Sequence, residues 1–415
     1  MADPTRILFL ARRYPPHIGG IETHCYELYT RLEKQAQVRL LANGHRSLVH
    51  LAWFIPYCFW VAFWAVLFRR IDAVYFADGV AGSLAPLLRP LGPARFILTV
   101  YGLEMTYKNP LARALMHAGA RACEKVVVIS QNSRKIVAAA GVPETKIETI
   151  YLGVEPRVLS EDERAPVQTR FEEKHGLRFG QDRVLLFFGR QVRRKGMVEF
   201  LEKGMPLLDK DIHLFIGGGR NLETDRIATQ RHELGIEDRV TLLGPIPDDE
   251  LAMLRACCDL FLMPNIRVPG DVEGFGQTQL ECMYSGTPVV AFAVDALPES
   301  VREGGYLIEP EDYAAFADQI HNFFAMSPAQ QAEEGRRSHG VVEVAYHEHG
   351  VMQVDIRGDG RQKNSRKTTK TENEYGAQRK EHGHGQTNGA MPHGVQPIQE
   401  NPIRRNYLYY SVYDL

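Results

Sequence analysis

Two glutamates flank a glycine-rich stretch beyond the middle of the chain. The stretch runs from Asp271 to Glu281, and seven residues separate Glu273 from Glu281. Between them, Gly274 and Gly276 allow backbone conformations, and a close approach of a ligand, that other residues do not. Carboxylates accept hydrogen bonds and donate none, so they suit the hydroxyl groups of a sugar. A tight turn with two surface glutamates would show the same pattern, and other parts of the chain must decide between these interpretations.

The residues after this loop favour a helix. Gln277 to Tyr284 contain no helix breaker, so we expect a helix that begins directly after Gly276. A helix N-terminus presents unpaired N–H groups and the positive end of the helix dipole, which together attract phosphate. The stretch therefore offers a position for phosphate beside two positions for hydroxyl groups.

Two other glycine-containing loops follow expected strands. Gly19-Gly20 comes after the apolar run at 7–11, and the loop from Gly189 to Gly196 comes after the apolar run at 184–188. Open α/β sheets bind ligands at the carboxyl ends of their strands. We therefore expect these two loops and the glutamate stretch to meet in one cleft.

The second loop carries two cations that suit a diphosphate. Arg190 can form a bidentate contact with phosphate, and Lys195 supplies a point charge. Such charge stabilises the negative charge that grows on a departing phosphate. Taken alone, both residues would more often be ordinary surface charges. Their place after a strand, in a loop that matches the first, favours binding.

Apolar runs and helical patterns alternate in two series, which predicts an α/β fold with parallel sheets. Two such series predict two Rossmann-like, doubly wound domains that face each other across a cleft. We expect domains at 1–157 and 158–335, followed by a tail at 336–415. The expected strands are 7–11, 38–42, 73–76, 96–100, 126–129 and 147–151, then 184–188, 213–216, 240–242, 260–263, 289–293 and 306–308.

The composition is that of an ordinary soluble protein. The 415 residues are 44% hydrophobic and 24% charged, and the formal net charge of −2 gives no general attraction to nucleic acid. None of the six cysteines forms a Cys-x-x-Cys pair, so no zinc or redox motif is indicated. The first residues lead into a strand rather than into the apolar core of a signal peptide. We expect a reduced, cytoplasmic protein without a nucleic-acid partner.

The uncharged stretch from Leu51 to Phe68 is unusual. It contains all three tryptophans of the chain, and two arginines follow it: Trp53, Trp60, Trp64, Arg69 and Arg70. A membrane span here would separate strands that should pair in one sheet, so we exclude spanning. Two interpretations remain. The stretch is either a buried helix or an amphiphilic helix through which residues 51–70 contact the cytoplasmic face of a membrane.

The tail at 336–415 is expected to be atypical and largely disordered. Residues 361–406 contain no Leu, Phe or Trp, so they cannot bury enough apolar surface to offset the entropy lost on folding. Three histidines lie here among glycine and glutamine, and we expect them to be solvated rather than bound to metal: His382, His384 and His393.

These motifs resemble those of the family 4 retaining glycosyltransferases, which have the GT-B fold. The residues that carry the match are Gly19-Gly20-Ile21-Glu22, Gly189-Arg190 with Lys195-Gly196, and Glu273-Gly274-Phe275-Gly276 through Glu281. The resemblance implies a hexosyltransferase that moves a hexose, with retention, from a nucleotide-diphosphate-sugar to a glycan or lipid-linked acceptor. The acceptor would lie mainly on domain 1–157 and the donor on domain 158–335. Residues 265–272 resemble those of members that make mannosides, so mannose is one candidate sugar.

The resemblance also implies residue roles. Arg190 and Lys195 would hold the diphosphate, and Glu273 the hydroxyl groups of the donor sugar; these three form the expected catalytic set. Glu281 would bind the ribose hydroxyls. The other donor-binding positions act mainly through the backbone: Gly19, Gly20, Gly189, Phe275, Gly276 and Gln277. No metal or other cofactor is implied, because the two cations and the helix end take its place.

Three features depart from the family pattern. Tyr101 stands where the family has a histidine that contacts the donor sugar, so Tyr101 becomes a candidate contact to that sugar. Leu152 replaces an asparagine in the family's Asn-Gly-Val. No segment after about Gly340 resembles the family's C-terminal helix, which crosses back onto the N-terminal domain. A non-catalytic nucleotide-sugar-binding or scaffold protein is therefore the alternative to an enzyme. A phosphorylase or epimerase fits less well.

Overall fold

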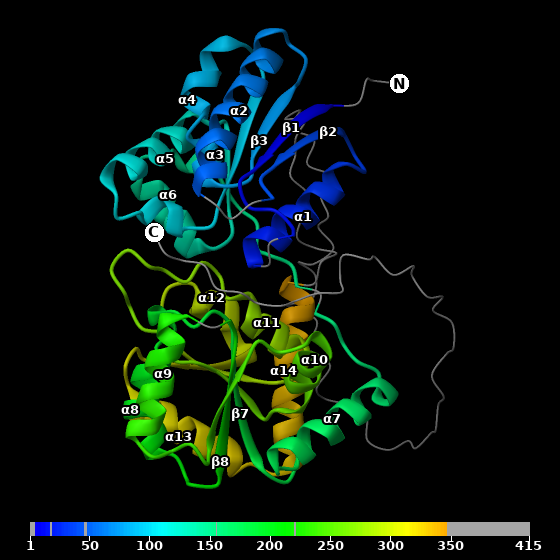
Figure 1. The fold of residues 1–415 in the computed structure, drawn as a ribbon, viewed down its shortest axis with the longest axis vertical. Helices are drawn as coiled ribbons and strands as arrows, with labels where there is room; N and C mark the ends of the chain where they lie inside the picture. The colour runs from blue at the N-terminus through cyan, green and yellow to red at the C-terminus, as the bar shows by residue number, and fades with distance from the viewer. Residues whose placement is uncertain (1–4, 17–18, 45–47, 155, 220, 347–415) are drawn as a thin grey trace, which may run out of the picture. The chain divides into compact units, whose positions relative to one another are not determined.

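The computed structural model describes residues 5–16, 19–44, 48–154, 156–219 and 221–346 (Figure 1). All of them belong to one compact unit. They form two six-stranded sheets, in which every recorded strand pair is parallel. The predicted fold class is therefore confirmed. The rest of the expected tail, with its three histidines, lies outside the described residues.

The first sheet has the strand order β2-β1-β3-β4-β5-β6. Its strands are β1 (Arg6–Ala11), β2 (Gln37–Ala42), β3 (Ala73–Phe76), β4 (Arg95–Val100), β5 (Lys125–Val128) and β6 (Ile147–Thr149). The helices of this half are α1 (Gly20–Leu32), α2 (Leu48–Leu67), α3 (Gly79–Gly82), α4 (Ala85–Leu88), α5 (Pro110–Ala122) and α6 (Gln131–Ala139), with 3-10 turns η1 (Arg89–Leu91), η2 (Leu103–Thr106) and η3 (Glu144–Lys146). The strand order reverses between β1 and β3, which is where open α/β sheets bind ligands.

The second sheet has the strand order β12-β11-β10-β7-β8-β9 and reverses between β7 and β10. Its strands are β7 (Arg183–Phe188), β8 (Ile212–Gly217), β9 (Val240–Gly244), β10 (Leu260–Met263), β11 (Val289–Phe292) and β12 (Gly305–Ile308). The helices are α7 (Glu161–His175), α8 (Met197–Lys203), α9 (Leu222–Glu233), α10 (Asp248–Cys257), α11 (Gln277–Tyr284), α12 (Leu297–Val301), α13 (Tyr313–Phe324) and α14 (Pro328–Tyr346), with 3-10 turns η4 (Arg193–Lys195), η5 (Met205–Leu207) and η6 (Arg302–Gly304).

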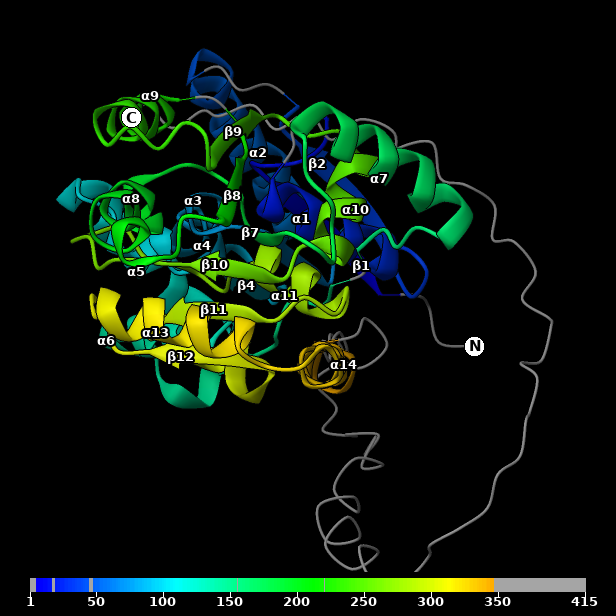
Figure 2. The same ribbon diagram turned by 90° about the horizontal axis from the view of Figure 1, so that it is seen from below.

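Alternate residues of a buried strand pack into different layers, because successive side chains point to opposite faces of a sheet. On β7, Leu185 and Phe187 belong to the core cluster that includes α8, α9 and α13. Val184, Leu186 and Phe188 belong to the cluster that includes α7, α10, α11 and α14. Figure 2 shows α8 and α9 on one side of this sheet and α7 and α10 on the other. A strand buried on both faces explains why its sequence reads as a continuous apolar run.

The C-terminal helix α14 differs from the sequence expectation. It runs through the expected boundary at 335, and its buried residues recur at helical spacing: Gly335, Ser338, Val342 and Tyr346. Its last residue returns to the first half, because the N–H of Val154 donates to the carbonyl oxygen of Tyr346 at 3.1 Å. Helix α14 thus ends against the first half, although the sequence after about Gly340 showed no likeness to the family's C-terminal helix. The sequence did not predict this helix because two of its four buried positions, Gly335 and Ser338, are not large apolar residues.

Helix α2 contains the uncharged stretch. Phe54, Cys58, Ala62 and Val66 are buried on the core of the first sheet. The three tryptophans are on average half exposed, with Trp53 and Trp60 at 54% and Trp64 at 50%. The interpretation of α2 as a buried helix is therefore wrong. Strands β1 and β3, on either side of α2 in the sequence, pair directly, as the exclusion of a membrane span requires.

Candidate functional site

Glu273 lies at the centre of a buried ion network after β10. Its side chain accepts a hydrogen bond from Asn265 Nδ2 at 3.1 Å and forms ion pairs with Lys195 Nζ at 2.8 Å and Arg194 Nε at 3.4 Å. All three contacts reach the same oxygen, Oε2. Glu273 is only 6% exposed. The network therefore fixes the carboxylate through Oε2.

The neighbouring cations keep Glu273 charged. Burial alone would raise its pKa, but Lys195, Arg194 and then Arg190 hold the pKa down to about 2. Burial in turn lowers the pKa of Lys195, which Glu273 opposes. Glu273 is therefore a carboxylate at neutral pH.

Two aspartates that the sequence did not single out position this network. Asp271 Oδ1 lies 3.2 Å from Arg194 NH1. Asp295 Oδ2 accepts from the backbone N–H of Glu273 at 2.8 Å. Asp295 has a φ of 52°, in the left-handed region that non-glycine residues seldom adopt. With this backbone conformation, the carboxylate of Asp295 points towards the backbone N–H of Glu273.

The glycines of the central loop allow close packing. Gly276 has a φ of 81°, and helix α11 begins at the next residue, Gln277. A Cβ on Gly274 would lie 2.7 Å from the carbonyl oxygen of Tyr101, on the other half of the chain. The ring of Phe275 is buried and stacks on Tyr151 at 5.6 Å. The Phe275 side chain therefore serves the packing of the core, and a donor contact through its backbone stays a prediction.

The first loop meets the third at the start of two helices. Helix α1 begins at Gly20, where a Cβ would lie 2.3 Å from the Oε1 of Gln277, the first residue of α11. At Gly19, a Cβ would lie 2.5 Å from the flexible carboxylate of Glu22. Together with the contact between Lys195 and Glu273, this arrangement confirms that the three loops meet.

Gly189 and Arg190 lie at the end of β7. Gly189 has a φ of 146°, and its carbonyl oxygen would lie 1.9 Å from a Cβ on Gly218, so the two backbones are in close contact. The side chain of Arg190 is exposed, and its charge acts on both Glu273 and Lys195. Arg190 is thus near the network without being buried in it.

Glu281 has an arginine partner that the sequence did not predict. It lies one turn after Gln277 on α11, so both side chains share one helix face. Arg255 NH1, on α10, lies 3.1 Å from Glu281 Oε2. Burial raises the pKa of Glu281, and Arg255 opposes that shift. Arg255 thus orients one carboxylate oxygen of Glu281.

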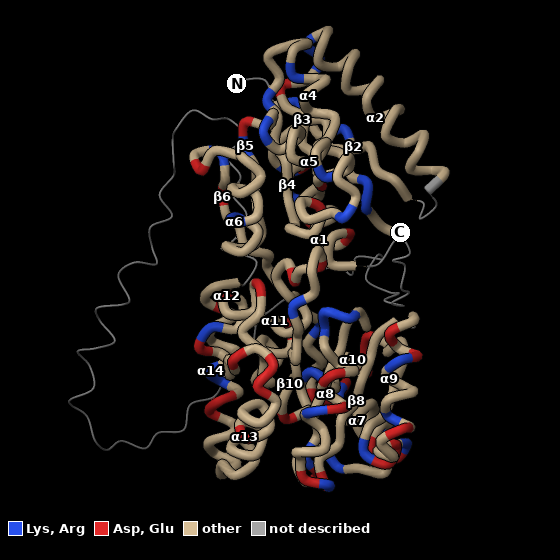
Figure 3. The backbone as a smooth tube through the Cα atoms, turned by 90° about the vertical axis from the view of Figure 1, so that its left-hand side faces the viewer, with Lys and Arg blue, Asp and Glu red and all other residues tan. Residues whose placement is uncertain are grey.

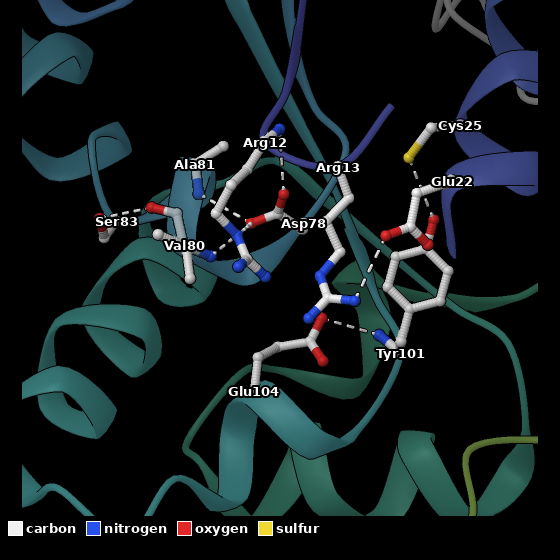
Figure 4. Close-up of polar contacts among 10 residues, drawn as sticks. All are labelled: Arg12, Arg13, Glu22, Cys25, Asp78, Val80, Ala81, Ser83, Tyr101 and Glu104. Carbon is white, nitrogen blue, oxygen red and sulfur yellow. Dashed lines mark hydrogen bonds and ion pairs between the residues drawn. The ribbon is translucent and has the colours of Figure 1, made fainter. Parts of the chain in front are cut away.

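The structure gives Tyr101 contacts that the sequence did not anticipate. Its hydroxyl group lies 2.6 Å from Nδ1 of His24 on α1 and 3.7 Å from the Sγ of Cys25. Its backbone N–H donates to Glu104 Oε1 at 2.9 Å. Figure 4 shows Tyr101 between Cys25 and Glu104. The hydroxyl group is therefore already bonded to the first helix, and its contact to the donor sugar stays a prediction.

A second cluster of charges lies at the carboxyl ends of β1 and β3 (Figure 4). Arg12 Nε lies 3.4 Å from Asp78 Oδ1, and Arg13 NH1 lies 3.4 Å from Glu22 Oε1. Asp78 also accepts from the first N–H groups of α3. With the buried Glu104, this cluster places three carboxylates and two guanidinium groups beside the first loop.

Two family models match the chain, one in each half. The model described as Glycosyltransferase Family 4 matches residues 18–158, and the model described as Glycosyl transferases group 1 matches residues 182–325. The two matches leave residues 159–181 between them, and the predicted boundary at 157–158 stays a prediction.

Curated relatives and solved structures agree with these matches. A GDP-mannose-dependent alpha-(1-6)-phosphatidylinositol monomannoside mannosyltransferase of Mycolicibacterium smegmatis is 31% identical over 278 residues, which cover 64% of this chain and 70% of the relative. The protein of the same description in Mycobacterium tuberculosis is 28% identical over 349 residues, covering 76% and 88%. The structure of Anabaena HepE in complex with UDP and glucose has a TM-score of 0.64 at 20% identity, covering 83% of this chain and 96% of HepE. Sucrose-phosphate synthase from Thermosynechococcus elongatus has a TM-score of 0.66 at 20% identity, covering 83% and 95%.

Two parallel Rossmann-like sheets, with ligand-binding loops at both strand-order reversals, define the class of GT-B glycosyltransferases. The chain belongs to glycosyltransferase family 4. The predicted family, the GT-B fold and the predicted enzyme class, a retaining hexosyltransferase, are confirmed.

Proposed function

We propose that this enzyme transfers mannose from GDP-mannose to a lipid-linked glycan acceptor, with retention at the anomeric carbon. The observation that carries the proposal is the Glu273 network, in which Lys195 and Arg194 hold a charged carboxylate in the loop that leads into α11. The mycobacterial relatives, which are described as GDP-mannose-dependent phosphatidylinositol monomannoside mannosyltransferases, support GDP-mannose and a phosphatidylinositol-linked acceptor.

Each side chain then has a defined task. The diphosphate binds the N–H groups at the start of α11 together with Arg190 and Lys195. Glu273 Oε1 accepts hydrogen bonds from the hydroxyl groups of the transferred sugar, and Glu281 accepts from the ribose. Arg190 is exposed before the donor binds, so it can close over the diphosphate without breaking the buried network.

The same cations stabilise the departing diphosphate. Negative charge grows on its oxygen as the bond to the sugar breaks, and Lys195 and Arg190 lie where that charge develops. The leaving phosphate takes the proton of the attacking acceptor hydroxyl on the same face of the sugar, which yields retention. We propose that no metal takes part. Asp209 and Asp211 have the spacing of a metal-binding pair, but both face Arg183 at the amino end of the second sheet, away from Glu273.

The acceptor is proposed to bind at the charged cluster of the first half. Arg13, Glu22 and Glu104 lie beside the Gly19-Gly20 loop, which contacts Gln277 at the donor side. Carboxylates and guanidinium groups together suit a ring with several hydroxyl groups and a phosphodiester.

Helix α2 is proposed to hold the enzyme on the cytoplasmic face of a bilayer. Among the described residues it is the one helix long and apolar enough to cross a membrane by length and composition. Figure 3 shows α2 in tan, without charged residues along its length. Trp53, Trp60 and Trp64 are on its exposed face, and Trp64 stacks on the exposed Phe68 at 5.5 Å. Arg69 and Arg70 follow directly, so an aromatic surface ends at two cations, which is the pattern of an interfacial helix at anionic lipids.

Serine at both Trp60 and Trp64 is expected to release the enzyme from anionic vesicles. Each tryptophan buried in the interface contributes about 1.5–3 kcal/mol, so the double variant should partition at least about tenfold less. Flotation with phosphatidylinositol-containing vesicles measures this. Leu111→Ser with Leu115→Ser is the matched control, because both leucines are exposed on α5. Equal flotation of the two double variants would contradict the proposed contact.

A donor screen tests the activity itself. The enzyme is incubated with GDP-mannose, UDP-glucose or ADP-glucose and a lipid-linked mannoside, and the product is analysed for its anomeric configuration. We expect turnover with GDP-mannose and an α-linked product. Nucleotide binding without turnover of any donor would instead support the non-catalytic alternative.

A further inference from the structure

The buried hydroxyl group of Tyr101 links α1 to the donor loop. The hydroxyl lies 2.6 Å from His24 Nδ1, and the two rings meet edge to face at 5.6 Å. The carbonyl oxygen of Tyr101 lies where a Cβ on Gly274 would clash at 2.7 Å. One residue thus contacts both the first helix and the loop that carries Glu273.

The protonation states of Cys25, Tyr101 and His24 determine the direction of the hydrogen bonds between them. Burial raises the pKa values of Cys25 and Tyr101, so the thiol and the phenol both keep their protons. Burial lowers the pKa of His24 to about 4, so its ring is neutral. The thiol can donate to the Tyr101 oxygen, and the Tyr101 hydroxyl then donates to His24 Nδ1. The second ring nitrogen, Nε2, therefore carries the hydrogen of the neutral imidazole.

The Nε2–H of His24 is available to a ligand. Among the described residues it has no hydrogen-bond partner, and the His24 side chain is half-buried rather than enclosed. His24 lies one helical turn after Gly20, so its side chain is on the face of α1 that meets Gln277. His24 thus shares a helix face with Gly20, which meets Gln277, and its ring contacts Tyr101, whose carbonyl group packs against Gly274.

We propose that His24 donates a hydrogen bond from Nε2 to the transferred sugar, and that Tyr101 is a positioning residue that holds the ring in the required tautomer and orientation. This inference rests on the proposed function, because it assigns a second residue to the sugar that Glu273 binds. Glu273 accepts hydrogen bonds from sugar hydroxyl groups, whereas His24 donates one to a sugar oxygen. The sugar is therefore bound by one acceptor and one donor.

Two amide substitutions separate a substrate contact from a structural link. Asparagine at position 24 places its amide near the Nδ1 position, so it keeps the bond to Tyr101 but cannot reach the sugar. Glutamine extends its amide to the Nε2 position. We expect His24→Asn to lower kcat/KM for GDP-mannose by about tenfold, which is the loss of one hydrogen bond to substrate. His24→Gln keeps the donor but not the bond to Tyr101, so it should lose no more than Tyr101→Phe does, and both variants at position 24 should bind GDP as wild type does.

A double-mutant cycle tests the role of Tyr101. Tyr101→Phe should lower kcat/KM in the wild-type background and have no further effect in His24→Ala, because Tyr101 acts through His24. Wild-type activity of His24→Asn, alongside an impaired His24→Ala, would overturn the sugar contact and leave a structural role. Independent losses from Tyr101→Phe and His24→Ala would overturn the positioning role. If wild type itself shows no turnover, the proposed function fails instead, which the donor screen detects separately.

Discussion

Glu273→Gln is expected to lower kcat for transfer by about a hundredfold to a thousandfold, the usual cost of removing one preorganised electrostatic group from a site. Glutamine keeps the shape of the side chain but not its charge, so it accepts more weakly from sugar hydroxyls. GDP lacks the sugar, and its affinity should change little. Initial rates with GDP-mannose, together with calorimetric titration of GDP, measure the two effects.

Glu273→Gln should also lower the free energy of unfolding, and a control variant separates this loss of stability from the loss of catalysis. Removing one partner of a buried ion pair costs about 3–5 kcal/mol, because Lys195 is then left without its closest counter-charge. Glu172 is similarly buried and lies 3.2 Å from Arg178, outside the site. Glu172→Gln should therefore lower the melting temperature but leave kcat unchanged. A wild-type kcat for Glu273→Gln would refute the role of Glu273.

The sequence was sufficient for elements that depend on local pattern. Strands such as β7 are short apolar runs, and the glycines at Gly19 and Gly276 directly precede helices. Parallel sheets place the carboxyl ends of their strands at one edge, so loops far apart in the chain could be expected to meet. That expectation correctly placed Lys195 beside Glu273.

The partners within the site could not be predicted, because they depend on the direction of individual side chains. Arg193 and Arg194 are neighbours in the sequence, yet their side chains are 60% and 5% exposed. Only Arg194 enters the network. Asp295 and Arg255 come from loops and helices with no glycine signal, and their roles follow from packing alone.

Helix α14 was missed for a related reason. Its exposed positions are strongly charged, and its buried stripe contains Gly335 and Ser338 instead of large apolar residues. A glycine is required at 335, because a Cβ there would lie 2.5 Å from the carbonyl oxygen of Gly286. Helix α14 therefore packs against the Gly286 backbone through a glycine, and its sequence lacks the apolar pattern from which helices are predicted.

Lys195→Met should lower transfer by at least about a hundredfold and make the remaining activity depend on pH. In the wild type, the pKa of Glu273 lies at about 2, below the ordinary 4.5. Its ionisation therefore stabilises the fold fully above pH 4.5, and that contribution is lost only as the pH falls towards 2. Without Lys195, burial is opposed mainly by Arg194 and Arg190, so the pKa of Glu273 rises.

The sign of this pH dependence distinguishes the proposed roles of Lys195. If the lysine both binds phosphate and keeps Glu273 ionised, residual kcat in Lys195→Met should fall as the pH decreases, while wild type stays flat over the same range. Lys203→Met, at an exposed position on α8, should behave as wild type does. A low but pH-independent kcat in Lys195→Met would mean that Arg194 and Arg190 suffice to keep Glu273 charged. The loss of phosphate binding by Lys195 would then account for the whole effect.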